Sequence, residues 1–382
     1  MSDVVVFLGS RMANLERHGT RWRAVLTRWA ADPRVSSLTV VDFPSFDPRR
    51  RLRVADEPTW LKGSRLLSVR VPLSTHVIGP LDPVVWRVVA RRLSAYLGGH
   101  VTNRAIVVAA PLWTPAAVRL SAGRRGFDAV DDWREHSSAR TAVTRSAQGY
   151  TLLPRFDVVT AVAAPLAESL SREAGRNVVH VGNGVDVAAY RDVAPADLPG
   201  LPDEPFAVYV GTVEQRVDMD LLLRTAERVP VVVAGPAEGA VAERLRGGAA
   251  RWLGPVPVGD VPALLKRASV GLLPHIPGPF TASMDPMKLL EYLASGLPVV
   301  TTLPSLAATS PRVTAAAPDA FVGAVEAALR GAGTAGRDVD PAVAGRDWDV
   351  VADRLLRLHV VGDADGSGAS GDLAGSGSGG AS

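Results

Sequence analysis

The stretch FAVYVGTVEQRVDMDLLLRTAERVPVVVAGP, residues 206–236, contains one complete strand–helix–strand unit. Its two apolar runs, residues 206–211 and 230–236, are short and rich in valine, as is typical of strands buried on both faces. Between them, residues 218–229 carry leucines at helical spacing. Buried strands that alternate with helices predict a parallel sheet in an α/β fold.

The same alternation continues along the chain on both sides of this unit. On the C-terminal side we expect strands at residues 251–256, 269–274 and 297–302 and helices at residues 237–248, 259–268, 286–295 and 318–331. On the N-terminal side we expect strands at residues 3–9, 37–43, 65–71, 104–111, 127–133, 157–162 and 177–184, with helices at residues 20–32, 82–99 and 164–175 and another that ends near residue 155. Two such runs in 382 residues predict two doubly wound, Rossmann-like domains that face a cleft.

A proline-rich segment separates the two runs. Residues 193–205 hold four prolines, which indicates an interdomain linker. We therefore expect a first domain at residues 1–192, the linker, a second domain at residues 206–340, a C-terminal helix at residues 341–361 that packs back on the first domain, and a disordered Gly/Ser-rich tail at residues 362–382.

The composition excludes several classes of site. The chain has no cysteine, which excludes disulfides and thiolate metal sites, and no two of its seven histidines have a close metal-ligand spacing. The N-terminus lacks the basic region and apolar run of a signal peptide, and no run of about 18 apolar residues occurs that could span a membrane. We therefore expect a cytoplasmic protein without a metal.

The charge of the chain is unevenly distributed. Residues 1–200 carry a net charge of +9 and residues 201–382 a net charge of −6. The basic half, with the arginine-rich loop at residues 47–58, favours an anionic acceptor, an anionic polymer or peripheral contact with a membrane surface. The alternative is a solvated basic surface with no partner. Nucleic acid is not expected as a partner, because no nucleic-acid-binding motif occurs.

The segment SMDPMKLLEYLASGLPVV, residues 283–300, predicts a polar loop, a helix and the next buried strand. Pro286 suits the first helical position, Asp285 or Ser283 would cap the helix, and Gly296 would end it. The helix would then begin beside the carboxyl end of the strand at residues 269–274. A helix N-terminus in that place is a ready anion site.

Lys288 and Glu291 fall on one face of this helix. Lys288 lies in the first turn, where the helix dipole disfavours a cation unless an anion is bound nearby. Glu291 would suit a ribose diol, the role of an acidic residue in dinucleotide sites. The alternative interpretation is a local surface ion pair. His275 follows a strand end directly and is a further candidate for contact with a phosphate.

Three motifs carry a resemblance to a known family. YVGTVEQRVDMDLLLRTAERVPVVVAGP (209–236), HVGNGVD (180–186) and DPMKLLEYLASGLPVVTT (285–302) resemble the nucleotide-sugar half of group-one glycosyltransferases, among them the teichuronic-acid-biosynthesis-like enzymes. FDAVDDW (127–133) resembles part of the same group's N-terminal domain. The resemblance covers residues 127–302 and is weak over residues 1–110. It implies the GT-B fold, with the acceptor bound by the first domain and the nucleotide sugar by the second.

The resemblance assigns roles to residues of the second domain. Glu291 would hold the ribose, while Lys288 and the backbone from Ser283 to Met287 would lie near the diphosphate and donor sugar. Arg216 would neutralise diphosphate charge. The loop after the first strand of this domain would also approach the phosphates through Gly211 and Thr212. On the acceptor side of the cleft, the resemblance places Gly9, Ser10, Asn183, Gly184 and Asp186.

Two positions depart from the family's pattern. The family usually carries a glutamate where this chain has Ser283, and an arginine where it has Thr212. The first departure puts the donor-sugar contact and the stereochemical outcome in doubt. The second leaves the phosphates to Arg216 or Lys288.

Transfer to an acceptor hydroxyl can require a base. Asp131, Asp132 and His136 follow a predicted strand end and are the candidates, although the two aspartates would also suit the cap of a following helix. Trp113 and Trp133 follow strand ends and would suit stacking on an acceptor or core packing.

The sequence thus predicts a glycosyltransferase that uses a nucleotide-diphosphate sugar as co-substrate and no cofactor, with retention implied by the resemblance. Its acceptor is a small molecule, a lipid-linked molecule or a glycan. The alternatives are a nucleotide-sugar epimerase of similar fold and a non-catalytic sugar-nucleotide or glycan-binding relative. No G-x-G-x-x-G follows a strand and no phosphate-loop motif occurs, which disfavours dehydrogenases and phosphate-loop NTPases.

Overall fold

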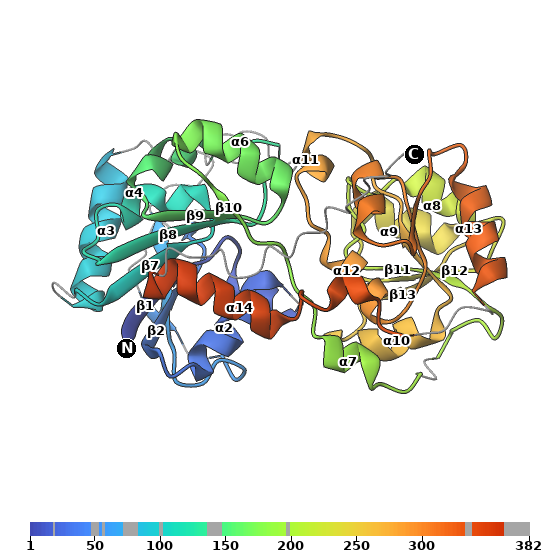
Figure 1. Ribbon diagram of the computed structural model, residues 1–382, viewed down its shortest axis with the longest axis horizontal. Coiled ribbons are helices and arrows are strands. Elements are labelled where there is room, and N and C mark those ends of the chain that lie inside the picture. Colours follow the sequence, from blue (N-terminus) through green and yellow to red (C-terminus); the bar gives the residue numbers. More distant parts are fainter. Residues whose placement is uncertain are drawn as a thin grey trace, which may run out of the picture.

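A computed structural model describes residues 1–17, 20–46, 53–55, 58–71, 83–98, 102–135, 147–195, 199–332 and 338–362 (Figure 1). Two α/β units lie next to each other, each with a central sheet and helices on both faces. The fold is therefore the expected pair of doubly wound sheets. In the described part of the chain, no helix is both long enough and apolar enough to cross a membrane.

The first unit contains an eight-stranded sheet in the order β10-β9-β8-β7-β1-β2-β5-β4. Its strands are β1 (Ser2–Phe7), β2 (Val35–Val41), β4 (Arg53–Ala55), β5 (Arg65–Ser68), β7 (Arg104–Val108), β8 (Arg124–Ala129), β9 (Val158–Ala161) and β10 (Val179–His180). All neighbours pair in parallel except β4 and β5. A separate parallel pair joins β3 (Ser45–Phe46) to β6 (Arg70–Val71). The helices of this unit are α1 (Met12–Arg17), α2 (Arg21–Ala31), α3 (Pro83–Leu97), α4 (Thr114–Ala117) and α6 (Ala164–Ala174), with 3-10 helices η1 (Pro111–Trp113) and η2 (Gln148–Arg155).

The second unit contains a parallel six-stranded sheet in the order β13-β12-β11-β14-β15-β16. Its strands are β11 (Ala207–Val210), β12 (Val231–Ala234), β13 (Arg251–Gly254), β14 (Val270–Leu273), β15 (Val299–Thr301) and β16 (Val313–Ala315). Its helices are α8 (Met219–Ala226), α9 (Gly239–Gly247), α10 (Val261–Arg267), α11 (Pro279–Ala282), α12 (Met287–Ala294) and α13 (Phe321–Gly331), with 3-10 helices η3 (Val258–Asp260), η4 (Pro304–Thr309) and η5 (Pro341–Val343).

The strand order places a crevice in each unit. In the first sheet the connections reverse direction between β1 and β7, and in the second between β11 and β14. Ligands of open parallel sheets bind beyond the carboxyl ends of the strands at such switch points. The loops that follow β1 and β7 in the first sheet, and β11 and β14 in the second, flank these switch points, and the loop after the neighbouring parallel strand β8 lies at the same edge.

The chain passes between the units twice. After β10 it crosses through α7 (Val187–Arg191) to the second sheet, and it returns through α14 (Trp348–Leu356) and the π-helical turn η6 (Arg357–Val361). α14 packs on α2 in the first unit, where the Trp29 indole N–H donates to the Ala352 carbonyl at 2.9 Å. Trp348, Val351 and Leu355 are buried in the same apolar cluster as strand β1.

Two local expectations were wrong, and the helix expected to end near residue 155 was found in part. Of the strand expected at residues 177–184, only β10 (Val179–His180) forms. Irregular backbone follows it, because residues 181–186 cross to the second unit. The segment ending at residue 155 is the 3-10 helix η2, which contains Pro154. α12 has Pro286 at its N-cap, and neither Asp285 nor Ser283 caps it, because both side chains bond elsewhere.

A buried polar chain joins η6 to the start of α2. Arg21 donates to both carboxylate oxygens of Asp128, at 2.9 and 3.0 Å, and both side chains are buried. Thr160 Oγ1 donates to Asp128 Oδ1 at 2.7 Å, and His359 Nε2 lies 2.9 Å from Thr160 Oγ1. Burial lowers the pKa of His359 to about 4, so its ring is neutral at pH 7.

The proton positions in this chain follow from donor counts. The single hydroxyl proton of Thr160 is directed at Asp128, so His359 Nε2 carries the proton of the ring. The buried Nδ1 atom, which has no partner among the described residues, is then the unprotonated nitrogen. Gly126 makes room for this ring, since a Cβ there would lie 1.9 Å from Nδ1.

Candidate functional site

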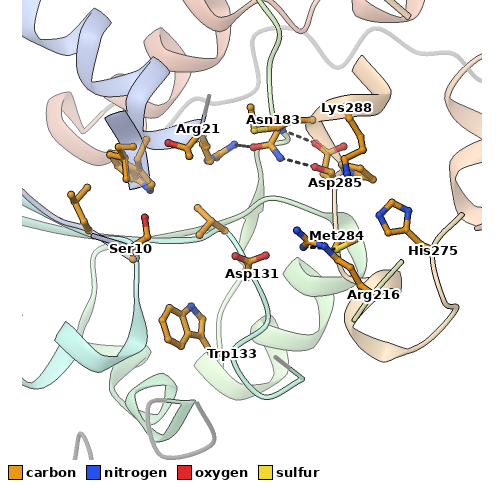
Figure 2. Close-up of a pocket in the computed structure, with 18 residues that line it drawn as sticks. Ser10, Arg21, Asp131, Trp133, Asn183, Arg216, His275, Met284, Asp285 and Lys288 are labelled. Carbon is orange, nitrogen blue, oxygen red and sulfur yellow. Dashed lines mark hydrogen bonds between the residues drawn. The ribbon is translucent and has the colours of Figure 1, made fainter. Parts of the chain in front are cut away.

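A cavity of about 360 Å³ lies between the two units, at the switch points of their sheets (Figure 2). Residues from the first unit form one wall: Leu8, Gly9, Ser10, Leu15, Thr20, Arg21, Trp22, Val130, Asp131 and Trp133. Asn183 from the crossing segment and residues of the second unit form the other wall: Arg216, His275, Met284, Asp285, Pro286, Met287 and Lys288.

Many of the residues that the sequence singled out meet in this cavity. The predicted site residues in its lining are Gly9, Ser10, Asp131, Asn183, Arg216, His275, Met287 and Lys288. Trp133 also lines it, whereas Trp113 is fully buried in the core against Phe7 and Trp86. Figure 2 shows Arg216, His275 and Lys288 on one side, Ser10 and Trp133 on the other, and Asp131 between them.

Lys288 is held over an aromatic ring. Its Nζ donates to the Tyr209 hydroxyl at 2.7 Å and lies 4.2 Å from the ring centroid, and no ion pair joins it to Glu291 in the described chain. Gly211, whose φ is 123°, makes room for the ammonium, because a Cβ there would lie 2.9 Å from Nζ. Burial, and then the charge of Arg216, lowers the pKa of Lys288 to about 7. An anion in the cavity would favour the protonated amine.

Arg216 lies beside this lysine in the loop after β11. Its guanidinium pairs with Glu214 at 2.5 Å, and NH1 lies 3.7 Å from the Met284 sulfur. The loop is tied to the one after β14, since Ile276 N–H donates to the Arg216 carbonyl at 2.8 Å. The Arg216 Nε–H is buried without a partner among the described residues, so the guanidinium retains a donor for a ligand.

His275 completes the basic wall. The side chain is buried, and its Nδ1 has no partner in the described chain. Burial, followed by the charges of Lys288 and Arg216, lowers the pKa of His275 to about 3, so the ring is neutral. A neutral imidazole offers one donor and one acceptor, which suits a phosphate or sugar oxygen.

Asp131 faces this wall across the cavity. Its side chain makes no hydrogen bond to any described residue, whereas its carbonyl accepts from the Tyr150 hydroxyl at 3.1 Å. Burial raises the pKa of Asp131 to about 6, against the opposing effect of Arg216. A carboxylate with a free lone pair and a pKa near neutrality can accept a proton from a bound hydroxyl.

The two other candidate bases are Asp132 and His136, and neither is among the described residues that line the cavity. The Asp132 carboxylate is taken up by Arg134, which donates to Oδ1 at 2.8 Å and to Oδ2 at 2.6 Å, and Asp132 does not line the cavity. The expectation that Asp132 faces the cleft as a base is therefore corrected: it orders the turn after β8 instead. His136 lies outside the described residues, as do residues 47–52 and 56–57 of the arginine-rich loop at residues 47–58.

Asp285 joins the two units. Its Oδ2 accepts from the Asn183 backbone N–H at 2.6 Å and from Arg346, and its carbonyl accepts from Asn183 Nδ2 at 2.6 Å. Arg346 Nε also donates to the Asn183 carbonyl at 2.6 Å. Asp285 precedes α12, so these bonds hold the helix that carries Lys288 against the crossing segment.

Several predicted residues do not line the cavity. Glu291 is part-buried deeper along α12, where burial raises its pKa and Lys288 and the Tyr190 hydroxyl oppose the rise. Ser283 Oγ donates to the Phe280 carbonyl at 2.8 Å and is buried, so it does not stand in for the family's glutamate. The residues that the cavity lining leaves out are Asp132, Asp186, Gly184, Gly211, Thr212, Ser283 and Glu291.

Sequence reasoning missed Arg21 and Trp22, and it named Met284 only as part of the backbone from Ser283 to Met287. Arg21 starts α2, lines the cavity and donates to the Val181 and Gly182 carbonyls at 2.9 and 2.8 Å. Its partners lie more than 100 residues away in the chain, so no local pattern marks it. Trp22 occupies a position that helical spacing assigns to the core, and the Met284 side chain was not singled out within its segment.

Comparison with known proteins finds similar sequences and structures. The family Glycosyl transferases group 1 matches residues 204–331. A Bacillus subtilis (strain 168) protein named as a teichuronic acid biosynthesis glycosyltransferase, TuaH, is 30% identical over 201 residues, which cover 47% of this chain and 50% of that protein. The chain thus matches about half the length of this relative.

Solved structures match over nearly the whole chain. Sucrose-phosphate synthase from Thermosynechococcus elongatus has a TM-score of 0.67 and 16% identity, covering 94% of this chain and 98% of that one. An α,α-trehalose-phosphate synthase (UDP-forming) from Burkholderia xenovorans has a TM-score of 0.66 and 12% identity, covering 94% and 99%. HepE from Anabaena, in complex with UDP and glucose, has a TM-score of 0.63 and 14% identity, covering 93% and 99%. The chain therefore has the GT-B fold, and its residues 204–331 match the Glycosyl transferases group 1 family.

Proposed function

We propose that this protein is a glycosyltransferase that moves a sugar from a nucleotide-diphosphate sugar to an acceptor hydroxyl. One observation carries the proposal: Lys288, Arg216 and His275 converge on one wall of a cavity whose opposite wall holds the free carboxylate of Asp131. The group 1 match over residues 204–331 supports it.

The basic wall suits a leaving nucleoside diphosphate. Negative charge develops on the diphosphate as the bond to the sugar breaks, and fixed cations stabilise that charge. Arg216 and Lys288 supply two cations and His275 a neutral hydrogen-bonding group. We propose that these side chains neutralise the diphosphate without a resident metal or other cofactor.

Asp131 suits the acceptor side of the reaction. We propose that it accepts the proton of the acceptor hydroxyl while Ser10 and Trp133 help to position the acceptor. Ser283 leaves the donor sugar without the family's glutamate, so retention of configuration rests on the resemblance alone. An epimerase would need a protonated acid on the face of the sugar opposite the base. His275 cannot be that acid at pH 7, because its pKa of about 3 leaves the ring neutral.

We propose an acceptor that is a small molecule, a lipid-linked molecule or a glycan. TuaH is named for teichuronic acid, an anionic polymer, and the Burkholderia xenovorans structure contains glucose-6-phosphate. Both agree with the positive charge of residues 1–200 in favouring an anionic acceptor. Nucleic acid is not among the proposed partners.

Thermal unfolding with UDP, GDP, dTDP and ADP tests the donor side. We expect one nucleotide, at about 100 times its dissociation constant, to stabilise the protein by roughly 2.7 kcal/mol. Glu291→Ala removes the carboxylate that the family resemblance assigns to the ribose and that lies outside the cavity lining; we expect it to abolish that shift, whereas Glu243→Ala, an exposed change on α9, should preserve it. No shift with any of the four would count against the donor assignment, and release of the free nucleotide from its sugar would separate a transferase from a non-catalytic binder.

The pKa of Lys288 predicts a pH dependence of nucleotide affinity. A bound diphosphate favours the protonated amine, and below pH 7 that form already dominates. As the pH rises from 7 to 8.5 the free protein loses this proton, so the affinity should fall about tenfold. Isothermal titration should show the fall in the wild type, and a weaker, flat profile in Lys288→Met. An equal fall in both proteins would assign the titration to another group.

A further inference from the structure

Helix α3 (Pro83–Leu97) presents an unusual outer face at the end of the first unit that is farthest from the second (Figure 1). Its inner face is apolar and packs in the core through Trp86, Val89, Ala90, Leu93 and Leu97. The outer face combines exposed hydrophobic side chains with arginines. This combination is not needed for packing.

The exposed hydrophobic residues are concentrated on this helix. Val84 is 66% exposed, Val88 46% and Tyr96 45%. They are three of only eight large hydrophobic side chains that are strongly exposed in the described chain. Val84 and Val88 are four residues apart and therefore adjacent on the helix surface.

Within the described residues, no acidic side chain pairs with the arginines of the same face. Arg87, Arg91 and Arg92 are exposed, and none forms an ion pair or hydrogen bond with another described side chain. Residues 83–98 contain no acidic residue. Elsewhere, surface arginines are commonly paired, as Arg172 is with Glu168.

We infer that the outer face of α3 is a docking surface for an anionic membrane. Arginine guanidinium groups bind lipid phosphates while their stems lie along apolar surface. Valine and tyrosine between them can enter the interfacial layer, where tyrosine is favoured. A soluble polyanion would match the arginines but would gain nothing from Val84 and Val88. The helix would lie in the plane of the surface and would not span it.

Vesicle co-sedimentation of the full chain tests this inference. We expect binding to vesicles of phosphatidylcholine mixed with phosphatidylglycerol, and little binding to phosphatidylcholine alone. Charge reversal by Arg87→Glu with Arg91→Glu should weaken binding roughly tenfold or more. Val84→Ser with Val88→Ser should weaken it by a smaller but measurable factor.

A matched control separates this surface from overall charge. Arg224→Glu with Arg330→Glu makes the same change in net charge on exposed positions of α8 and α13 in the second unit, and should leave binding within about twofold. Equal losses in the two charge-reversed proteins would overturn the inference. Absence of vesicle binding would also overturn the inference. So would a protein that binds both vesicles and heparin, a soluble polyanion, with no loss of binding in Val84→Ser with Val88→Ser. Circular dichroism would confirm that each variant is folded.

Discussion

Replacing Asp131 with asparagine is expected to lower kcat of sugar transfer by about 10²- to 10⁴-fold, the usual contribution of a general base. Asparagine keeps the size of the side chain but cannot accept the proton of the acceptor hydroxyl. Asp131 makes no side-chain hydrogen bond within the described structure, so the change should leave the fold intact. Nucleotide affinity, measured by titration, should stay close to that of the wild type because the cations lie on the other wall.

The pH profile tests the same assignment independently. Only the ionised carboxylate acts as a base, and burial places the pKa of Asp131 at about 6. The kcat of sugar transfer by the wild-type protein should therefore rise with pH through about 6 and then level off. This rise should be missing in Asp131→Asn. Glu135→Gln, an exposed carboxylate change four residues away, is the control and should behave as the wild type. Full activity in Asp131→Asn would remove Asp131 from the mechanism.

Replacing Asp128 with alanine is expected to lower the free energy of unfolding by about 3–5 kcal/mol, as breaking one side of a buried ion pair does. Asp128 is fully buried and Arg21 nearly so, with two hydrogen bonds between them. Alanine would leave the Arg21 charge uncompensated and remove the acceptor of Thr160. Urea unfolding followed by tryptophan fluorescence would measure the change.

Asp349→Ala provides the matched comparison for Asp128. Asp349 also pairs with an arginine, Arg28, but its side chain is 80% exposed. Surface pairs contribute about 0–1 kcal/mol, so this change should cost little. If the two alanine variants lost the same stability, the buried chain from Arg21 to His359 would not have the structural role assigned to it.

The sequence was informative wherever structure depends on neighbouring residues. Valine-rich runs bounded by glycine or proline marked β1, β11, β12 and β14 because strands buried on both faces need continuous apolar sequence. Alternation of strands and helices then predicted the parallel sheets, and the strand ends indicated where a ligand would bind. On this basis two doubly wound domains, Lys288, His275 and Asp131 could be named before any contact was known, and the family resemblance added the GT-B fold and Arg216.

The sequence did not predict the hydrogen-bond partner of a side chain that can either cap a helix or bond elsewhere. Asp285 and Ser283 stand where a helix cap is expected, yet Asp285 bonds to Asn183 and Arg346, and Ser283 to Phe280. A cap contributes about 1 kcal/mol, so a charged partner brought in by the fold can outweigh it. For Asp285 the long-range partners Asn183 and Arg346 decided the outcome, whereas Ser283 bonds to the local Phe280 carbonyl instead of capping the helix.

The amino-acid sequence by itself determined the two α/β units and which loops could carry the chemistry, because hydrophobic periodicity is a local property. Only the tertiary structure decided that the Asp131 carboxylate is free while that of Asp132 is bound to Arg134. It alone placed Arg21 in the cavity wall, through partners more than 100 residues away. The physical reason is that burial and ion pairing depend on what the fold brings together, and these set whether a charged side chain can act on a ligand or only hold the structure.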